Sequence, residues 1–312
     1  MKDKNYVKGI IFAIISLFLV SLQPIVAISR PKVLDAYIFA AMTCIIETLI
    51  IIPFVIMERQ KLKVEMKNEP INTNDIQLLL HGWKKNKKLL LYIGVNFGFA
   101  QILFYVAYEM AGAINGSLAQ QTMIIYGLLF GFLINHEKIS KTQILFSFLL
   151  LFGLTIAVTQ GKFNVLEVNF GVLIMVITTM LWMLAHALTK PMFEQNQITP
   201  IQFCFFRFFL SGLFLISTYF IFYPISNISL LLDPINIFFF ILIGALYGFD
   251  VLFWYKSLSK IEMSKVTVIV SPMPILVAFF AFIILGELFT IFHLIGTIII
   301  IFSISMIVRK HG

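Results

Sequence analysis

Ten long apolar stretches, separated by short polar segments, dominate this sequence and decide which solvent its fold requires. A transmembrane helix needs about 20 apolar residues to cross the hydrocarbon core of a bilayer. With 60% hydrophobic and 12% charged residues, the 312-residue chain has more apolar surface than a water-soluble fold can bury. We therefore predict an all-α integral membrane protein with ten transmembrane helices. The predicted spans are Val7 to Ile28, Ala36 to Met57, Leu89 to Met110, Ile114 to Ile134, Ile144 to Thr159, Phe170 to Leu188, Ile201 to Tyr223, Ile235 to Leu258, Val266 to Leu285 and Ile291 to Val308.

The positions of lysine and arginine predict the orientation in the membrane. With the N-terminus inside, 19 of the 23 lie in inner segments, Arg30, Lys32 and Lys162 lie in outer ones, and Arg207 lies within a span. Cytoplasmic loops carry such an excess. We therefore predict a multi-pass protein of the plasma membrane with both termini cytoplasmic and the first span retained. The net charge of +8 then faces an anionic inner leaflet, so it predicts a lipid partner and no nucleic acid.

The long connection from 58 to 88 carries eight of these basic residues. Asn72 to Asp75 is typical of a helix start, and the apolar residues between Ile76 and Trp83 precede four lysines. This pattern predicts a short helix in the inner headgroup region. Two interpretations remain, a regulatory lipid sensor and an ordinary solvated basic loop.

The two halves of the chain repeat one another. A shift of 150 residues aligns, without a gap, Gly94 with Gly244, Gly98 with Gly248, Phe104 with Trp254, Tyr105 with Tyr255, Phe132 with Phe282 and Glu137 with Glu287. We predict two five-helix domains, 1–160 with the basic loop 58–88, and 165–312. Because five is odd, the second domain enters the membrane from the opposite side, which gives the inverted repeat of many alternating-access carriers.

Several motifs resemble the EamA-type repeat of the drug/metabolite transporter superfamily. They are Phe253 to Leu258, Ser271 to Pro274, Leu285 to Thr290, Leu294 to Gly296, Trp182 and Phe206-Arg207-Phe208. The first half departs from the pattern at Ile124, Asn135-His136, Met42 and Val20. The resemblance implies a secondary transporter that exports a small organic solute by alternating access, through a cavity walled by helices one to four and six to nine. Metabolites, amino acids and drugs are the substrates that it implies.

Polar residues inside the spans are the candidate substrate-binding groups, because a polar group at membrane depth needs a cavity or a partner. Glu47 shares a helix face with Thr43 and suits a cationic group, a coupling proton or a neutral, hydrogen-bonded acid. In the third span, Gln101 and Tyr105 share a stripe with small residues, which either admit a substrate or pack a neighbouring helix. Gln120 in the fourth span is expected to face inward.

Two further spans carry candidate binding residues. Tyr247, Asp250 and Trp254 share a face of the eighth span, where an acid between two rings suits an amine, although an aromatic packing stripe is the simpler interpretation. Trp182 and His186 share a face of the sixth span, as a proton relay or as interhelical packing.

Prolines and charges inside the spans suggest structural roles. Pro24, Pro272 and Pro274 interrupt the first and ninth spans and are candidate hinges. Arg207 and Asp250 lie at matching depths in consecutive helices, about 12 Å from the inner end, so we predict an ion pair between them. Snorkelling of Arg207 to the interface is the alternative.

Enzyme and cofactor signatures are not found in the sequence. It has no zinc-protease spacing, nucleophile elbow or phosphate-binding loop, and both cysteines lie in apolar runs, so we predict no metal and no cofactor. A passive channel and a membrane-embedded, lipid-modifying enzyme are the alternative functions. The prediction leaves a homodimer open.

Overall fold

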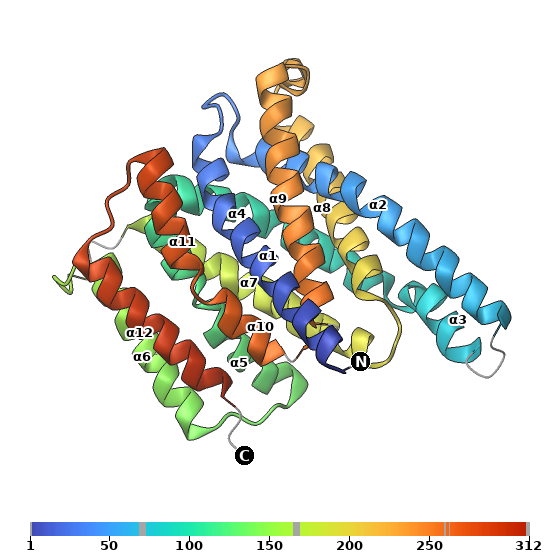
Figure 1. Ribbon diagram of the computed structural model, residues 1–312. Coiled ribbons are helices and arrows are strands. Elements are labelled where there is room, and N and C mark those ends of the chain that lie inside the picture. Colours follow the sequence, from blue (N-terminus) through green and yellow to red (C-terminus); the bar gives the residue numbers. More distant parts are fainter. Residues whose placement is uncertain (1, 69–72, 165–168, 259, 262, 310–312) are drawn as a thin grey trace. The chain divides into compact units, whose positions relative to one another are not determined.

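The computed structural model describes residues 2–68, 73–164, 169–258, 260–261 and 263–309 (Figure 1). Every regular element in these ranges is helical, as predicted. The α-helices are α1 (Lys2–Ser29), α2 (Ala36–Asn68), α3 (Thr73–His81), α4 (Lys87–Gln120), α5 (Met123–Asn135), α6 (Lys141–Val158), α7 (Phe170–Glu194), α8 (Pro200–Phe222), α9 (Pro234–Leu258), α10 (Met263–Val270), α11 (Met273–Phe280) and α12 (Ile291–Val308). Three short helices of other types, η2 (Gly82–Asn86), η4 (Ile225–Leu231) and η5 (Ala281–Leu285), complete the order.

The number of spans agrees with the prediction of ten. By length and hydropathy, nine helices of the described residues qualify as membrane spans, and Met123–Asn135 is a shorter apolar helix. The stretch Ile76–Gln120 is longer than one span because α4 joins two helical segments across a kink. The kink lies at Gly112, where φ is 79°. Residues 113–120 therefore join α5 to form the fourth span, which completes two sets of five.

The fourth and ninth spans are each broken in the middle, at positions related by the 150-residue repeat. Gln121 and Thr122 separate residues 113–120 from α5, and Ser271 and Pro272 separate α10 from α11. Proline lacks the N–H that a continuous helix requires, which explains the second break and confirms the interruption predicted in the ninth span. In the first repeat no proline marks the break. There the Thr122 hydroxyl donates to a backbone carbonyl three residues earlier, at 2.8 Å.

Both interrupted spans end in the same local conformation. His136 (φ 55°) and Gly286 (φ 70°) adopt the left-handed region at the helix end. The following helices, α6 and α12, each begin with a capping box, in which Ser140 or Thr290 is the cap. In α12 the box is completed by His293, whose Nδ1 accepts from the backbone N–H of Thr290 at 3.1 Å. The repeat is therefore visible in the backbone as well as in the sequence.

The first span is not broken at its proline. α1 is a single helix that contains Pro24, so the interruption predicted there is not found. The missing proline N–H leaves the carbonyl of Val20 without its usual helical donor. Pro24 is buried, and its assignment as a hinge stays a prediction.

The basic connection from 58 to 88 is more helical than predicted. α2 continues to Asn68 instead of ending at Met57, because Glu, Lys, Gln and Met favour the helix. Lys61 and Glu65 pair one turn apart at 3.6 Å, with both side chains largely exposed. The second span thus extends beyond its apolar part as a polar helix.

A short helix, α3, occupies the place predicted for it in this connection. Asn72, predicted as part of its start, lies outside the described residues. The Trp83 ring that follows α3 packs on Phe206 of α8, with ring centroids 4.8 Å apart. A position in the headgroup region stays a prediction.

The helices divide into two compact units, which we describe separately. Unit 1 comprises residues 1–30, 103–184 and 249–312, and unit 2 comprises 31–102 and 185–248. Each unit takes helices from both halves of the sequence, so the domains 1–160 and 165–312 stay a prediction about the repeat. In unit 1, α6 runs alongside α12, and in unit 2, α2 packs along α8 (Figure 1).

Glycines bring helices of unit 2 into close contact. A Cβ on Gly94 of α4 would lie 2.4 Å from the Leu210 Cβ of α8, and the Ser211 hydroxyl donates to the Gly94 carbonyl at 2.7 Å. In the second repeat, a Cβ on Gly244 of α9 would lie 2.5 Å from Ile46 of α2. The packing interpretation of the small residues in the third span is therefore confirmed at Gly94, and Gly244 makes the same kind of close contact.

Candidate functional site

In unit 1, Asp250 of α9 is held by two side chains from α1. The Ser16 hydroxyl donates to Oδ1 at 2.5 Å, and the Gln23 amide donates to Oδ2 at 3.0 Å. Seven residues separate the two donors, so they lie on one face of α1. The two hydrogen bonds therefore fix the position of the Asp250 side chain, which belongs to a partly buried residue.

Trp254 lies one turn further along α9 and packs into an apolar cluster of unit 1. The buried members of this cluster are Ala13, Ile261 and Val266. The packing interpretation that we left open for this aromatic ring therefore has direct structural support.

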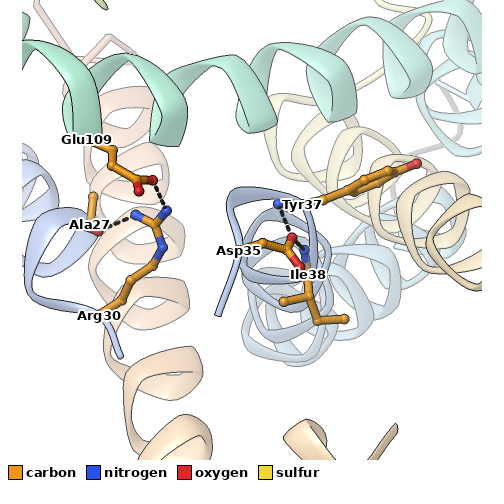
Figure 2. Close-up of polar contacts among 6 residues, drawn as sticks. All are labelled: Ala27, Arg30, Asp35, Tyr37, Ile38 and Glu109. Carbon is orange, nitrogen blue, oxygen red and sulfur yellow. Dashed lines mark hydrogen bonds and ion pairs between the residues drawn. The ribbon is translucent and has the colours of Figure 1, made fainter. Parts of the chain in front are cut away.

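A second polar cluster of unit 1 joins α1 to α4, as Figure 2 shows. The Arg30 guanidinium donates to the Ala27 carbonyl at 2.5 Å and pairs with the Glu109 carboxylate at 2.6 Å. Its carbon lies 5.9 Å from the ring centroid of Tyr105, a residue with no exposed surface. Tyr105 is thus close to a paired cation, and Arg30, which the sequence placed in an outer loop, is 8% exposed.

The broken fourth span carries its own polar contacts in unit 1. Gln120, at the end of the segment 113–120, accepts a hydrogen bond from the Tyr108 hydroxyl at 2.6 Å. Thr122, two residues later and within the break, shares a hydrogen bond with Thr179 of α7 at 2.8 Å. The two contacts satisfy polar groups at the break.

Trp182 of α7 lies close to this region. Its ring centroid is 5.6 Å from that of Phe104 on α4, and the side chain is 7% exposed. The indole N–H is buried and has no hydrogen-bond acceptor among the described residues. An unsatisfied donor at this depth is available to a polar ligand or a water molecule.

Glu287, which follows the ninth span, holds the start of the half-helix 113–120. Its carboxylate accepts from the backbone N–H groups of Ala113 at 2.7 Å and Ile114 at 3.1 Å. An anion is favoured at a helix N-terminus, where N–H groups lack internal partners. Gly112 permits the turn that precedes it, and a Cβ there would lie 3.1 Å from the same carboxylate.

In unit 2, Asp35 organises the start of α2, also shown in Figure 2. Its Oδ1 accepts from the backbone N–H groups of Tyr37 at 2.7 Å and Ile38 at 2.9 Å. Its Oδ2 accepts from the Tyr219 hydroxyl of α8 at 3.2 Å. Burial and the nearby Asp35 carboxylate raise the pKa of Tyr223, which stacks on Tyr219. Asp35 thus caps the N-terminus of α2 and links α2 to α8, which is a structural role.

The candidate site of unit 2 lies around a buried arginine. Arg207 of α8 is 7% exposed, and its guanidinium carbon lies 3.8 Å from the ring centroid of Phe97 on α4. The same ring meets His186 of α7 edge-on at 5.5 Å. Glu47 of α2, 1% exposed, lies in the interior of the same unit. A cation, an acid and an imidazole thus lie in the interior of this unit.

Comparison with known families decides what kind of protein carries these sites. The EamA-like transporter family matches residues 7–159 and again residues 169–309. The chain belongs to the EamA-like transporter family. The resemblance drawn from the sequence motifs is therefore confirmed, and so is a fold of two repeats of five helices.

Solved structures share the fold of this chain. Among 22 matching chains, one titled only as the crystal structure of a protein has a TM-score of 0.54 and 11% identity, over 98% of this chain and 96% of its own. Comparison with curated proteins yields no relative. At this identity the structural likeness shows the fold alone.

The predicted binding residues of this EamA-like protein fall in both units. Unit 1 holds Tyr105, Gln120, Trp182, Asp250 and Trp254, and unit 2 holds Glu47, Gln101, His186 and Tyr247. Arg207 and Asp250 belong to different units, so the ion pair between them stays a prediction. Within the described residues, no group of three potential ligands could hold a metal ion.

Sequence reasoning missed the partners of these residues. The sequence predicted no role for Ser16 or Gln23, and Glu287 was only one member of a motif. The alignment of Glu137 with Glu287 was the one available signal that this acid recurs for a structural reason.

Proposed function

We propose that this EamA-like protein is a secondary transporter that exports a small organic solute, such as a metabolite, amino acid or drug, by alternating access. The family membership supports transport of small solutes. The export direction and the solute are part of the proposal.

The observation that carries the proposal is the pair of broken spans at repeat-related positions. Residues 113–120 and α10 are half-helices that end at turns inside the fourth and ninth spans. Discontinuous helices in corresponding positions are a recurring way for carriers to build a solute site near the midplane, because their ends expose backbone groups that can bind. A continuous apolar helix offers no such groups.

The side chains proposed to bind the solute are polar or aromatic groups inside the spans. Gln120 ends the first half-helix, and the Trp182 indole has an unsatisfied N–H in the same unit. Asp250, held by Ser16 and Gln23, supplies a fixed negative charge. We propose Glu47, Gln101, Tyr105, His186, Tyr247 and Trp254 as further members of the site.

We also propose a plasma-membrane location with both termini cytoplasmic. The bias of lysine and arginine towards one set of loops supports this orientation. The basic side then faces anionic lipid of the inner leaflet.

Transport is tested by counterflow into vesicles that contain the purified protein. Vesicles are loaded with a mixture of unlabelled amino acids, amines and organic acids, and uptake of each labelled compound is measured separately. A carrier exchanges labelled for unlabelled solute, so uptake should rise transiently above equilibrium. Asp250→Asn should lower the initial rate by roughly tenfold, because a hydrogen bond to a charged group contributes about 1.5 kcal/mol or more.

The matched control is Asp233→Asn. Asp233 is exposed and caps α9, a role that asparagine fills equally well, so its uptake should equal that of the wild type. Equal uptake by Asp250→Asn would remove Asp250 from the site. Flux that is neither saturable nor stimulated by internal solute would favour the passive channel.

A further inference from the structure

Arg207 is a buried cation in the interior of unit 2. The residue is 7% exposed and lies seven residues, roughly 10 Å, from the start of α8. Among the residues of unit 2 that the structure describes, its guanidinium has no hydrogen bond and no ion pair. Its contacts are with the faces of Phe97 at 3.8 Å and Phe208 at 5.5 Å.

Burial of this guanidinium costs free energy unless another group accepts its hydrogen bonds. A guanidinium has five N–H donors in a planar fork, and a cation at membrane depth normally has a polar partner. An aromatic face offsets part of the charge but accepts none of these hydrogen bonds in the plane of the fork. Arg30 shows the ordinary solution in this same chain, because it reaches both a carbonyl and a carboxylate.

We propose that Arg207 binds the carboxylate of the transported solute. A carboxylate matches the guanidinium fork with two parallel hydrogen bonds, the strongest pairing available to arginine. Phe97 stacks on one face of the guanidinium and so orients the fork, while His186 meets the far edge of the same ring. The inference rests on the proposed function and adds a substrate class to it.

The charge of Arg207 favours a single carboxylate over a phosphate group. Arg207 supplies one positive charge. It therefore balances the single charge of a carboxylate, whereas a doubly charged phosphate group would leave one negative charge uncompensated at membrane depth. The selected solute is therefore a monocarboxylate.

The competing account of Arg207 is the ion pair with Asp250. The ion pair and the carboxylate site predict different effects of Arg207→Met on the stability of the protein without ligand. If Arg207 is unpaired, Arg207→Met removes a buried cation and leaves no partner stranded, so the apparent melting temperature should stay the same or rise. If Arg207 is paired with Asp250, the same change should lower it clearly.

The experiment measures the melting temperature of the purified, full-length protein in detergent, with and without ligand probes. The probes are phenylacetate and butyrate, each compared with its neutral amide at the same concentration and ionic strength. A ligand that binds the folded state raises the melting temperature in proportion to its affinity. The carboxylates, and not the amides, should stabilise the wild type.

Three variants make the test specific. Arg207→Met should weaken carboxylate binding at least tenfold. Arg207→Lys keeps the charge but not the planar fork, so its carboxylate affinity should lie between those of the wild type and Arg207→Met. Arg30→Met is the matched control, because it removes a paired arginine. It should lower the melting temperature without ligand and leave the affinity for phenylacetate unchanged.

Two results would overturn the proposal. One is a marked loss of stability in ligand-free Arg207→Met, comparable to that of Arg30→Met. The other is wild-type protein that responds to no carboxylate, or responds equally with Arg207→Met. Vesicle counterflow separates this inference from the proposed function. Arg207-dependent binding of a carboxylate without any exchange would refute transport alone. Exchange of another solute at the same rate in the wild type and in Arg207→Met would refute the carboxylate site alone.

Discussion

Removing the Glu287 side chain should uncouple the half-helix 113–120 from the loop that follows the ninth span. The carboxylate accepts from Ala113 N–H at 2.7 Å and from Ile114 N–H at 3.1 Å. Hydrogen bonds to a charged group contribute about 1.5–3 kcal/mol each, and we take the lower value because Glu287 is only partly buried. Two such bonds give a loss of about 3 kcal/mol for Glu287→Ala.

The expected change is large enough to measure by thermal unfolding in detergent. At about 2 °C per kcal/mol for a chain of this size, the apparent melting temperature should fall by roughly 6 °C. Glu287→Gln keeps one acceptor oxygen without the charge, so it should lose about half as much. Glu194→Ala is the matched control, because Glu194 is 62% exposed in a surface pair with Lys190 at 3.5 Å, and such pairs contribute less than about 1 kcal/mol. If Glu287→Ala unfolds at the temperature of Glu194→Ala, the carboxylate does not hold the half-helix and the reasoning is wrong.

Two other expectations can be measured directly. Gly94→Ala should destabilise the protein by about 1–3 kcal/mol in the same unfolding assay, because its Cβ would lie 2.4 Å from Leu210, whereas Gly248→Ala, with nothing nearer than 3.6 Å, should cost much less; equal losses would contradict the packing argument. In intact cells, a membrane-impermeant thiol reagent should label a cysteine at Asp233 and not one at Lys85, and both native cysteines are buried; labelling at Lys85 from outside would reverse the orientation.

Local features of the sequence were sufficient to predict the spans and the break in the ninth one. Hydropathy is a property of consecutive residues, and Pro272 acts on its own helix, so neither needs knowledge of distant segments. The equivalent break at Thr122 carried no such local signal. Its hydroxyl meets Thr179 from another helix at 2.8 Å, a contact that only the packed structure reveals.

The sequence by itself determined the membrane as solvent, the ten apolar segments and the five-plus-five repeat, because these follow from composition and from spacing along the chain. Only the tertiary structure decided the partners of the buried polar groups. Asp250 meets Ser16 from 234 residues away, Glu287 meets Ala113 from 174 residues away, and the Arg207 guanidinium lies over the ring of Phe97, a contact that the sequence did not predict. The physical reason is that helix periodicity fixes which residues share a face, whereas the residue opposite depends on which helices pack together and at what height.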